Sequence, residues 1–225
     1  METRSISLDG PAGAGKSTLA RRAAKHLGMI YVDTGALYRC IGLYALRKGV
    51  SPRDADGIAS LLPDINLEMK YDDEGVQRML MNSDDVTGDI RSPEASSYAS
   101  DVSAIPSVRD FLLSMQRLMA EKYDVIMDGR DIGTVVLPNA GLKVFLTAEL
   151  DVRAKRRHLE LLEKDPGISL DKVRDDMRIR DKNDSEREVA PLKPAEDSII
   201  LDTTYLDADE SFDAFCGLVY KRFGK

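Results

Sequence analysis

The sequence contains no tryptophan, two cysteines and two histidines, and these scarcities exclude several kinds of site. Cys40 and Cys216 are too few and too far apart for a disulfide framework or a metal site, so we interpret both as small apolar fillers. We interpret His26 and His158 as structural or solvated. No apolar run approaches the roughly 20 residues of a membrane helix, and the first residues lack the apolar core of a secretory signal. We therefore expect a cytoplasmic protein that does not engage a membrane.

Acidic residues outnumber basic ones, 39 to 32, which argues against binding of a nucleic acid polymer. The arginines are nevertheless clustered, because seven of the 19 fall between Arg153 and Arg187. A planar guanidinium group binds phosphate or carboxylate through paired hydrogen bonds, so this clustering indicates capture of such a group. A chain of 225 residues is long enough for one domain with a substantial core. We expect a monomer with a single domain over residues 1–225.

Short apolar runs alternate with helical patterns along the chain. The runs are typical of strands that are covered on both faces, and they are Ser5–Asp9, Met29–Val32, Val125–Asp128, Lys143–Leu146 and Ser198–Leu201. The main helical stretches between them are Lys16–Leu27, Gly35–Arg47, Pro106–Lys122 and Asp151–Lys164. This alternation predicts an α/β fold with a parallel sheet and helices on both sides. In such sheets, ligands lie beyond the carboxyl ends of the strands.

Two segments interrupt this alternation. In residues 63–91, apolar and polar residues alternate over Ile65–Tyr71, an acidic turn follows, and apolar residues return over Val76–Met81. That pattern predicts an antiparallel hairpin, which is either a surface elaboration or a wall over a substrate. Residues 153–187 are a charged helical segment with few large apolar residues, and we interpret them as a lid.

A phosphate-binding motif follows the first predicted strand. Gly10-Pro11-Ala12-Gly13-Ala14-Gly15-Lys16-Ser17 matches G-x-x-x-x-G-K-[ST] and leads directly into a predicted helix. The glycines let backbone N–H groups surround a β-phosphate at the positive end of that helix. We expect Lys16 to reach the β- and γ-phosphates and the Ser17 hydroxyl to ligate Mg²⁺. The motif predicts a nucleoside triphosphate site; the alternative is a glycine turn without a ligand.

A triphosphate site alone does not identify the reaction. A GTPase would need an N-K-x-D motif, and the nearest string, Lys182-Asn183-Asp184-Ser185, does not fit. A kinase with a small-molecule acceptor fits the chain length best. The alternative from another class is a switch protein that hydrolyses ATP slowly while it holds a partner. Such a switch would show partner-dependent ATPase activity and no nucleotide acceptor.

Two polar clusters follow predicted strands and are therefore expected at the same edge of the sheet. The first is Asp33–Arg39, in which Asp33 or Thr34 is the expected N-cap of the next helix. The second is Asp128–Thr134, in which Asp128 resembles a Walker B carboxylate. Charged residues that gather at strand ends beside a phosphate motif favour an acceptor site.

A further cluster lies on the predicted lid. Arg153, Arg156 and Arg157 have i, i+3, i+4 spacing and so share a helix face, where like charges repel unless an anion arrives. That arrangement predicts a lid that closes over a triphosphate and excludes water. The alternative is a solvated helix stabilised by Glu160 and Glu163.

Four segments together resemble the bacterial cytidylate kinase family: Gly10–Thr18, Asp33–Arg39, Asp128–Pro138 and Arg180–Leu192. They occur in the family's order, over nearly the whole chain, and the hairpin insert is also a family feature. Small departures are Ser17, where some members have Gly, and Thr34, where many have Ser. The resemblance implies a five-stranded parallel sheet with a P-loop, a monophosphate-binding region enlarged by the insert, and a mobile lid.

The resemblance also implies transfer of the γ-phosphoryl group of ATP to CMP or dCMP, with Mg²⁺ as the cofactor. Position by position, ATP would be bound by Gly10, Pro11, Ala12, Gly13, Ala14, Gly15, Lys16, Ser17, Thr18, Arg156 and Arg157, with Ser17 as a metal ligand. CMP would be bound by Thr34, Arg39, Ser100, Arg109, Arg130, Asp131, Arg180, Asp184 and Arg187. In that assignment Arg39, Arg130 and Arg187 hold the acceptor phosphate, and the catalytic residues are Lys16, Arg130, Arg156 and Arg187.

The residues assigned to the base suit cytosine. Asp131 and Ser100 can accept hydrogen bonds from its N4 amino group, and Arg109 can donate to N3 or O2. Uracil would leave Asp131 facing a carbonyl, so we expect UMP to be a poorer substrate. The alternative within the enzymes is a P-loop kinase of another small acceptor, such as UMP or a polyol-like metabolite.

Overall fold

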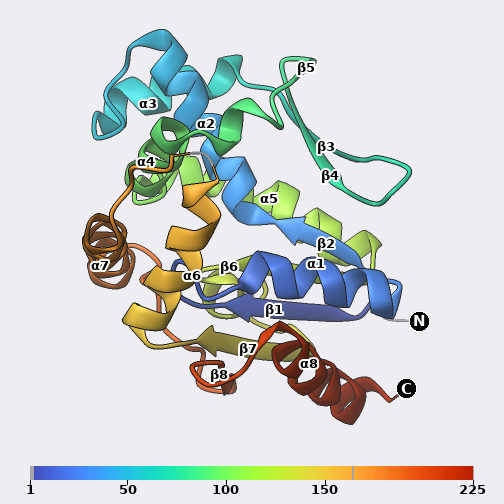
Figure 1. Ribbon diagram of the computed structural model, residues 1–225. Coiled ribbons are helices and arrows are strands. Elements are labelled where there is room, and N and C mark those ends of the chain that lie inside the picture. Colours follow the sequence, from blue (N-terminus) through green and yellow to red (C-terminus); the bar gives the residue numbers. More distant parts are fainter. Residues whose placement is uncertain (1–2, 164, 225) are drawn as a thin grey trace.

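The computed structural model describes residues 3–163 and 165–224 and contains one parallel and one antiparallel sheet (Figure 1). The main sheet has five strands in the order β2-β6-β1-β7-β8, and every pairing in it is parallel. The strands are β1 (Ser5–Asp9), β2 (Ile30–Asp33), β6 (Val125–Gly129), β7 (Leu142–Thr147) and β8 (Ile199–Asp202). The five predicted runs are confirmed, with ends that differ by one residue at most.

Helices cover both faces of the main sheet. On one face, α1 (Lys16–Leu27) and α8 (Ala208–Phe223) pack over β1 and β7, and α5 (Pro106–Lys122) packs over β2 and β6 on the other. In β6, Ile126 belongs to the first of these cores, while Val125 and Met127 belong to the second. Both faces of β6 are therefore buried, which is why this run is apolar without alternation. The edge strand β8 is largely exposed, so the expected cover on both faces is wrong for that strand. The predicted boundaries of α1 and α5 are confirmed.

A third apolar core surrounds α2 (Thr34–Lys48), which rises from the end of β2. The insert forms β3 (Leu67–Tyr71), β4 (Gln77–Met81) and β5 (Asp84–Asp85), so the predicted antiparallel hairpin is confirmed and gains a short third strand. The other elements of this half were not predicted: α3 (Ala55–Leu61), α4 (Pro93–Val102) and the 3-10 turns η1 (Leu62–Asp64) and η2 (Asp89–Arg91). The insert therefore packs on the half of the molecule that carries the Asp33–Arg39 cluster.

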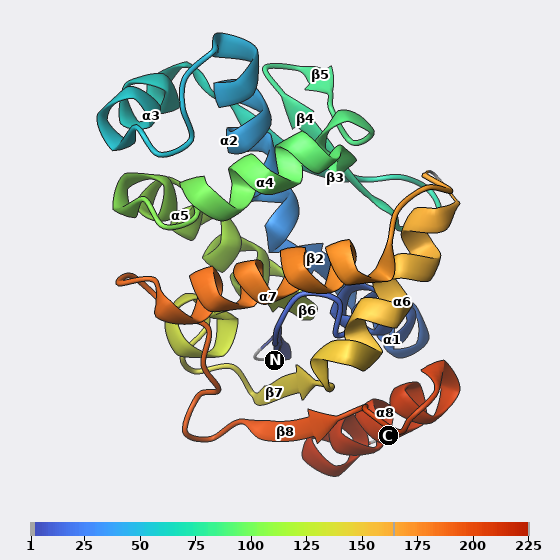
Figure 2. The ribbon, with the colours of Figure 1, turned by 60° about the vertical axis from the view of Figure 1, so that its left-hand side comes forward.

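The charged segment forms α6 (Leu150–Leu162) and α7 (Leu170–Glu186), and Figure 2 shows α7 crossing in front of the sheet. The predicted end of the first of these helices, Lys164, lies outside the described residues. A polar contact of α7 reaches the loop after β1, where Asp181 Oδ1 accepts from Ala12 N at 3.2 Å. Another reaches the segment after β6, where Asp184 Oδ2 accepts from Arg130 Nε at 2.8 Å. The helix thus lies against the carboxyl ends of the strands.

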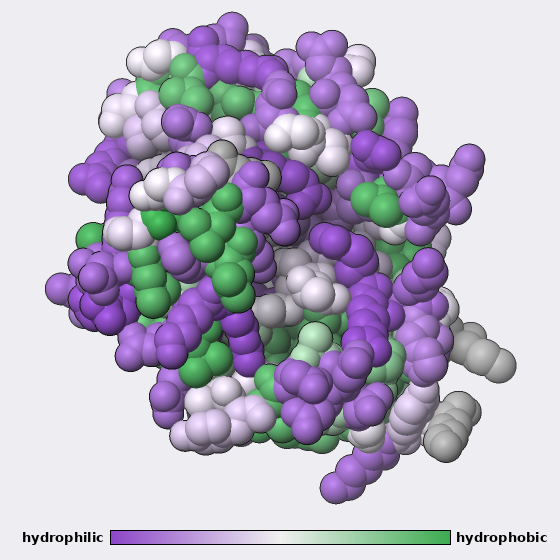
Figure 3. All heavy atoms as spheres, in the orientation of Figure 1, coloured by the Kyte–Doolittle hydropathy of each residue, from purple (hydrophilic) through white to green (hydrophobic). Residues whose placement is uncertain are grey.

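The face shown in Figure 3 is mostly hydrophilic, with apolar residues in scattered groups. Among the described residues, no helix combines the length and the apolar composition that crossing a membrane requires. Cys40 and Cys216 are both buried and unpaired, as expected for apolar fillers.

Candidate active site

The phosphate loop joins β1 to α1 in a shape that only glycine fits at two points. Gly10 has φ of 151°, and a Cβ there would lie 2.0 Å from the Leu146 carbonyl oxygen. Gly15, at the N-cap of α1, has φ of 86° in the left-handed region. The backbone N–H groups at the start of α1 lack intrahelical partners, so the loop forms an anion-binding end.

Lys16 is buried beneath this loop. Its ammonium group donates to the carbonyl oxygens of Gly10 and Pro11, both at 2.7 Å, and a third N–H remains for another acceptor. Burial, and then the charge of Arg130, lower the pKa of Lys16 well below its ordinary value. A buried cation of this kind favours an anionic ligand, because a negative charge would offset both effects.

Asp128, at the end of β6, faces the start of α1. Its carboxylate accepts hydrogen bonds from Ser17 Oγ at 2.8 Å and from the Tyr31 hydroxyl at 3.2 Å. Burial, with the nearby charge of Asp33, raises the pKa of Asp128 to about 6. A hydroxyl and a carboxylate side by side offer hard oxygen donors, which suits Mg²⁺ shared with nucleotide phosphates. The residues present therefore fit the expected metal.

Asp9 connects the phosphate loop with the segment after β6. One carboxylate oxygen accepts from the backbone N–H of Ile132 at 2.8 Å and the other from that of Gly133 at 2.7 Å. Burial raises the pKa of Asp9 to about 6, against the effect of these hydrogen bonds. This role was not predicted, although the first strand run ends in Asp9, which is a visible signal in the sequence.

Asp131 lies between two of the predicted acceptor residues. Its two oxygens accept from Arg109 and, at 3.1 Å, from Arg187 Nη2. Ser103 touches the same pair, since its carbonyl accepts from Arg109 and its hydroxyl from Arg187. Ser103 was not predicted; the predicted Ser100 lies one turn earlier on α4 and accepts from the Ser103 hydroxyl through its carbonyl oxygen.

Four further residues that are predicted to bind CMP lie at the same edge of the sheet. Arg130 pairs with Asp184, and although burial opposes the effect, Arg130 and Arg180 lower the pKa of Asp184. Arg39 Nη2 pairs with Asp33 Oδ2 at 2.7 Å. The Nε atoms of Arg39 and Arg180 are buried without a hydrogen-bond partner. Buried donors without partners are rare in folded proteins and indicate that a ligand completes them.

The N-cap of α2 is Asp33, which was one of the two predicted candidates. Its carboxylate accepts from Ala36 N at 3.0 Å. Thr34, the other candidate, instead donates its hydroxyl to the Asp128 carbonyl oxygen at 2.8 Å. The two polar clusters after β2 and β6 are thereby joined.

Each of the three arginines of α6 has acceptors within the chain. Arg153 donates to the carbonyl oxygen of Ala12, in the phosphate loop, and to the carboxylate of Asp181, which also accepts from Ala12 N. Arg156 donates to the carbonyl oxygens of Thr203 and Leu206 after β8, at 2.7 and 3.1 Å. Arg157 pairs with Glu160 at 2.8 Å, which agrees with the alternative of a stabilised solvated helix for that residue.

Comparison with known proteins identifies relatives over nearly the full length. Residues 6–220 match the family model described as cytidylate kinase. The chain is 48% identical over 221 residues to cytidylate kinase of Caldicellulosiruptor bescii, covering 98% of this chain and 97% of that protein. It is 48% identical over 204 residues to cytidylate kinase of an Exiguobacterium species, covering 91% of each.

Among solved structures, an uncharacterized protein from Eubacterium ventriosum matches with a TM-score of 0.53 at 13% identity, covering 98% of this chain and 100% of that chain. That likeness concerns the fold alone. The family model spans most of the chain, and the relatives named above are matched almost end to end. This chain belongs to the cytidylate kinase family.

Proposed function

We propose that the chain is a nucleoside monophosphate kinase that transfers the γ-phosphoryl group of ATP to CMP or dCMP, giving ADP and CDP or dCDP. The observation that carries this proposal is the group of buried and partly buried cationic side chains at the carboxyl ends of the parallel strands, Lys16, Arg130 and Arg180. Lys16 lies under the phosphate loop, and the charges of Arg130 and Arg180 are close enough to lower its pKa further after burial. Such a concentration of positive charge suits two phosphate groups that must approach one another.

The donor would bind along residues Gly10–Thr18, with its phosphates against the loop N–H groups and Lys16. When bound, Mg²⁺ would neutralise charge on the β- and γ-phosphates, held by Ser17 and Asp128. Arg156 and Arg157 are proposed to contact ATP from α6, which requires each to exchange its present acceptor for the nucleotide.

The acceptor would bind with its phosphate between Arg39, Arg130 and Arg187. All three guanidinium groups are already oriented, Arg39 by Asp33, Arg130 by Asp184 and Arg187 by Asp131. Orientation before binding lowers the entropy lost when the phosphate is aligned. Arg180 and Asp184 are assigned to the sugar, Thr34 to the same pocket, and Ser100, Arg109 and Asp131 to cytosine.

In the proposed reaction, an oxygen of the acceptor phosphate attacks the γ-phosphorus, and the bond from the γ-phosphorus to the β,γ-bridging oxygen breaks. The attacking oxygen already carries negative charge, so no general base is needed. The chain's contribution is alignment together with neutralisation of the spreading charge by Lys16 and the arginines. A lid over residues 153–187 would exclude water, and the insert over residues 63–91 would enlarge the acceptor region. A monomeric state and a cytoplasmic location remain predictions.

A coupled ADP-release assay with ATP and Mg²⁺ tests the proposal. We expect turnover with CMP and dCMP and little with UMP, AMP or no acceptor. A preference for UMP would contradict the roles of Asp131, Ser100 and Arg109 while keeping the kinase class. ADP release that ignores every acceptor would contradict the kinase assignment itself and favour the ATP-dependent switch.

A further inference from the structure

Strand β4 of the antiparallel insert carries one polar side chain on the face that it packs against α2. Gln77, Met79 and Met81 of β4 point to that face, and all three are buried. The two methionines belong to the apolar core around α2, so they attach the insert through apolar burial. Gln77 is only 7% exposed and adds nothing to that core. A buried amide needs hydrogen-bond partners, and its partners therefore indicate its role.

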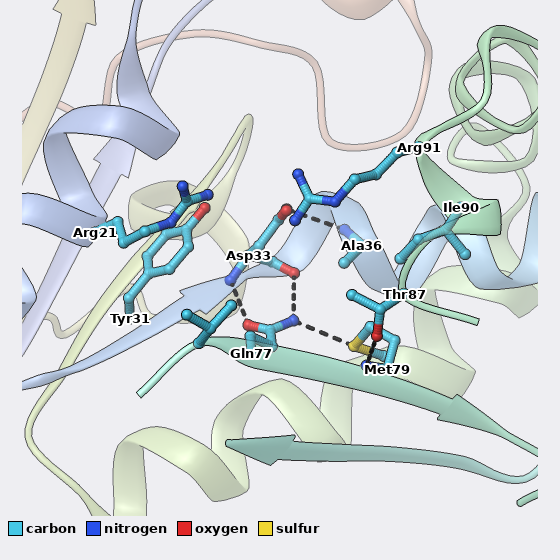
Figure 4. A pocket seen from close by; sticks show the side chains of 10 residues that line it. Arg21, Tyr31, Asp33, Ala36, Gln77, Met79, Thr87, Ile90 and Arg91 are labelled. Carbon is cyan, nitrogen blue, oxygen red and sulfur yellow. Dashed lines mark hydrogen bonds between the residues drawn. The ribbon is translucent and has the colours of Figure 1, made fainter. Parts of the chain in front are cut away.

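Gln77 finds two partners on the backbone of one residue, Asp33, and its Nε2 also donates to Met79 Sδ at 3.2 Å. Its Oε1 accepts from Asp33 N at 2.9 Å, and its Nε2 donates to the Asp33 carbonyl oxygen at 3.3 Å (Figure 4). In the main sheet β2 is an edge strand that pairs with β6 alone. Its outer side presents N–H and C=O groups that no strand of that sheet takes up. The Gln77 amide thus binds the strand edge as a neighbouring strand would.

A second hydrogen bond links the insert to the same edge. Tyr71, the cross-strand partner of Gln77, donates its hydroxyl to the Tyr31 carbonyl oxygen at 3.0 Å. Tyr31 and Asp33 are two positions apart in β2, so their backbone groups face the same side. The two links hold positions with different roles. Tyr31 lies within β2, whereas Asp33 is also the N-cap of α2.

Both carboxylate oxygens of Asp33 are committed. Oδ1 accepts from Ala36 N and caps α2, while Oδ2 accepts from Arg39 Nη2 at 2.7 Å. The ion pair is mostly shielded from solvent, with side-chain exposures of 20% for Arg39 and 15% for Asp33. Since the side chain of Asp33 holds Arg39 in place, a shift in the Asp33 backbone would move the guanidinium group with it.

We propose that Gln77 is a positioning residue for the acceptor phosphate: by fixing the backbone of Asp33, it fixes the carboxylate that orients Arg39. The inference rests on the proposed function, in which Arg39 binds the phosphate of CMP. It gives the insert a defined task at the acceptor site that needs no contact between the insert and the nucleotide.

The variant Gln77→Met keeps the length of the side chain and removes both hydrogen bonds to Asp33. We expect the KM for CMP and the Kd for CMP measured calorimetrically without ATP to rise about fivefold to tenfold, since a lost buried hydrogen bond has roughly that effect. The KM for ATP should stay within about twofold, because the phosphate loop is not attached to Asp33. Equal rises in both KM values, or an unchanged KM for CMP, would overturn the proposal.

Two matched controls separate positioning from general loosening of the insert. Tyr71→Phe removes the other link to β2 without touching Asp33, and Arg78→Met changes the next residue of β4, whose exposed side chain pairs with Asp72. Neither should change the KM for CMP. If Tyr71→Phe raises that KM as much as Gln77→Met does, attachment of the insert in general is responsible and the specific role of Gln77 is excluded.

A double-mutant cycle tests the route through Arg39. In an Arg39→Gln background the guanidinium group is absent, so Gln77→Met should raise the KM for CMP no further. A rise as large as in the wild-type background would show that Gln77 acts by another route.

The variant Gln77→Glu provides a second readout, which also serves if Gln77→Met does not fold. A buried carboxyl at this place is protonated more readily, and its O–H can then donate to the Asp33 carbonyl oxygen as the amide does. Other charged or titratable groups facing the site are Asp33 and Tyr31 of β2, Arg39 of α2, Tyr71 of β3, Arg21 of α1 and Arg91 of η2. We therefore compare the variant with the wild type at each pH.

The KM for CMP of Gln77→Glu, divided by that of the wild type at the same pH, should fall when the pH is lowered from 8.5 to 6. A ratio that does not change with pH would contradict the proposal. The wild type measured alongside separates the two hypotheses. A wild type that neither binds nor phosphorylates CMP refutes the proposed function, whereas an active wild type with an unaffected Gln77→Met refutes the positioning role alone.

Discussion

The hydroxyl of Ser17 donates a 2.8 Å hydrogen bond to the carboxylate of Asp128, although the two residues are 111 positions apart. The bond joins the start of α1 to the end of β6, where the proposed ATP and CMP sites would meet. Asp128 is 4% exposed, and burial with the charge of Asp33 raises its pKa to about 6. A carboxylate held in such a place destabilises the folded chain at neutral pH, which is expected of a group kept for a ligand.

The variant Asp128→Asn should therefore be more stable than the wild type and less active. The pKa of Asp128 is about 6 in the folded chain, above the ordinary value of 3.8. The loss of folding stability caused by the ionised carboxylate is therefore complete above about pH 6 and disappears as the pH falls towards 4. We expect a Tm higher by several degrees at pH 8 and little difference near pH 4.5. The kcat should fall on the order of 10²-fold or more, through loss of a charge beside the phosphates. Thermal unfolding of the variant and the wild type at pH 8 and pH 4.5 tests this expectation. A variant with a lower Tm than the wild type at pH 8 would contradict it.

Lys16→Met should lower kcat on the order of 10³-fold, because a charge clamp on the transferred phosphoryl group contributes effects of that size. The fold should remain, since within the described residues the ammonium group donates only to the two loop carbonyls of Gly10 and Pro11. Lys25→Met, an exposed position on the same helix, is the matched control and should behave as wild type. Initial rates at saturating ATP and CMP give the comparison. Near-normal turnover of Lys16→Met would remove this residue from the mechanism.

Much of the parallel sheet could be predicted because its inner strands β1, β6 and β7 are largely buried on both faces and therefore appear in the sequence as short apolar runs. The edge strand β8 is also an apolar run, although Ile199 and Ile200 are exposed. The start of α1 at Lys16 and its end before Gly28 follow from local signals, since Gly15 and Gly28 both adopt the left-handed conformation at its caps. The helix α8 was not predicted, although a capping box between Asp207 and Glu210 marks its start.

The partners of the arginines could not be predicted in the same way. Helical spacing places Arg153, Arg156 and Arg157 near one face, but it does not say what lies beyond that face. In the structure, Arg153 turns to the phosphate loop and Arg156 to the segment after β8, and both contacts come from elements far away in sequence. Likewise the link between Gln77 and Asp33 depends on how the insert docks on an edge strand, which a polar residue in an alternating pattern does not reveal.

Asp131→Asn should weaken the discrimination between CMP and UMP. An amide can donate as well as accept, so the preference for the amino group of cytosine over the carbonyl of uracil is reduced. We expect the CMP:UMP ratio of kcat/KM to fall about tenfold or more, with the KM for ATP changed less.

Part of any loss of activity will come from the ion pairs of Asp131 with Arg109 and Arg187, so the ratio is the informative quantity. The control Asp110→Asn removes a negative charge next to Arg109 in the chain at an exposed position. That variant should leave the ratio unchanged. An unaltered ratio in Asp131→Asn would rule out base reading by this residue.

Arg180→Met should weaken acceptor binding without weakening the fold. The Nε of Arg180 is buried without a partner, and burial, followed by the charge of Arg130, lowers its pKa to about 10. The guanidinium group is still charged at pH 7.5, and its interactions within the folded chain offset little of the cost of burying it. Its removal should therefore leave the Tm equal or higher. CMP should raise the Tm of the wild type clearly and that of the variant much less, because stabilisation by a ligand follows its affinity. Arg178→Met, whose exposed side chain pairs with Asp175 on the same helix, should respond to CMP as the wild type does. A variant with a lower Tm and an undiminished response to CMP would assign Arg180 to the stability of α7 and not to the acceptor.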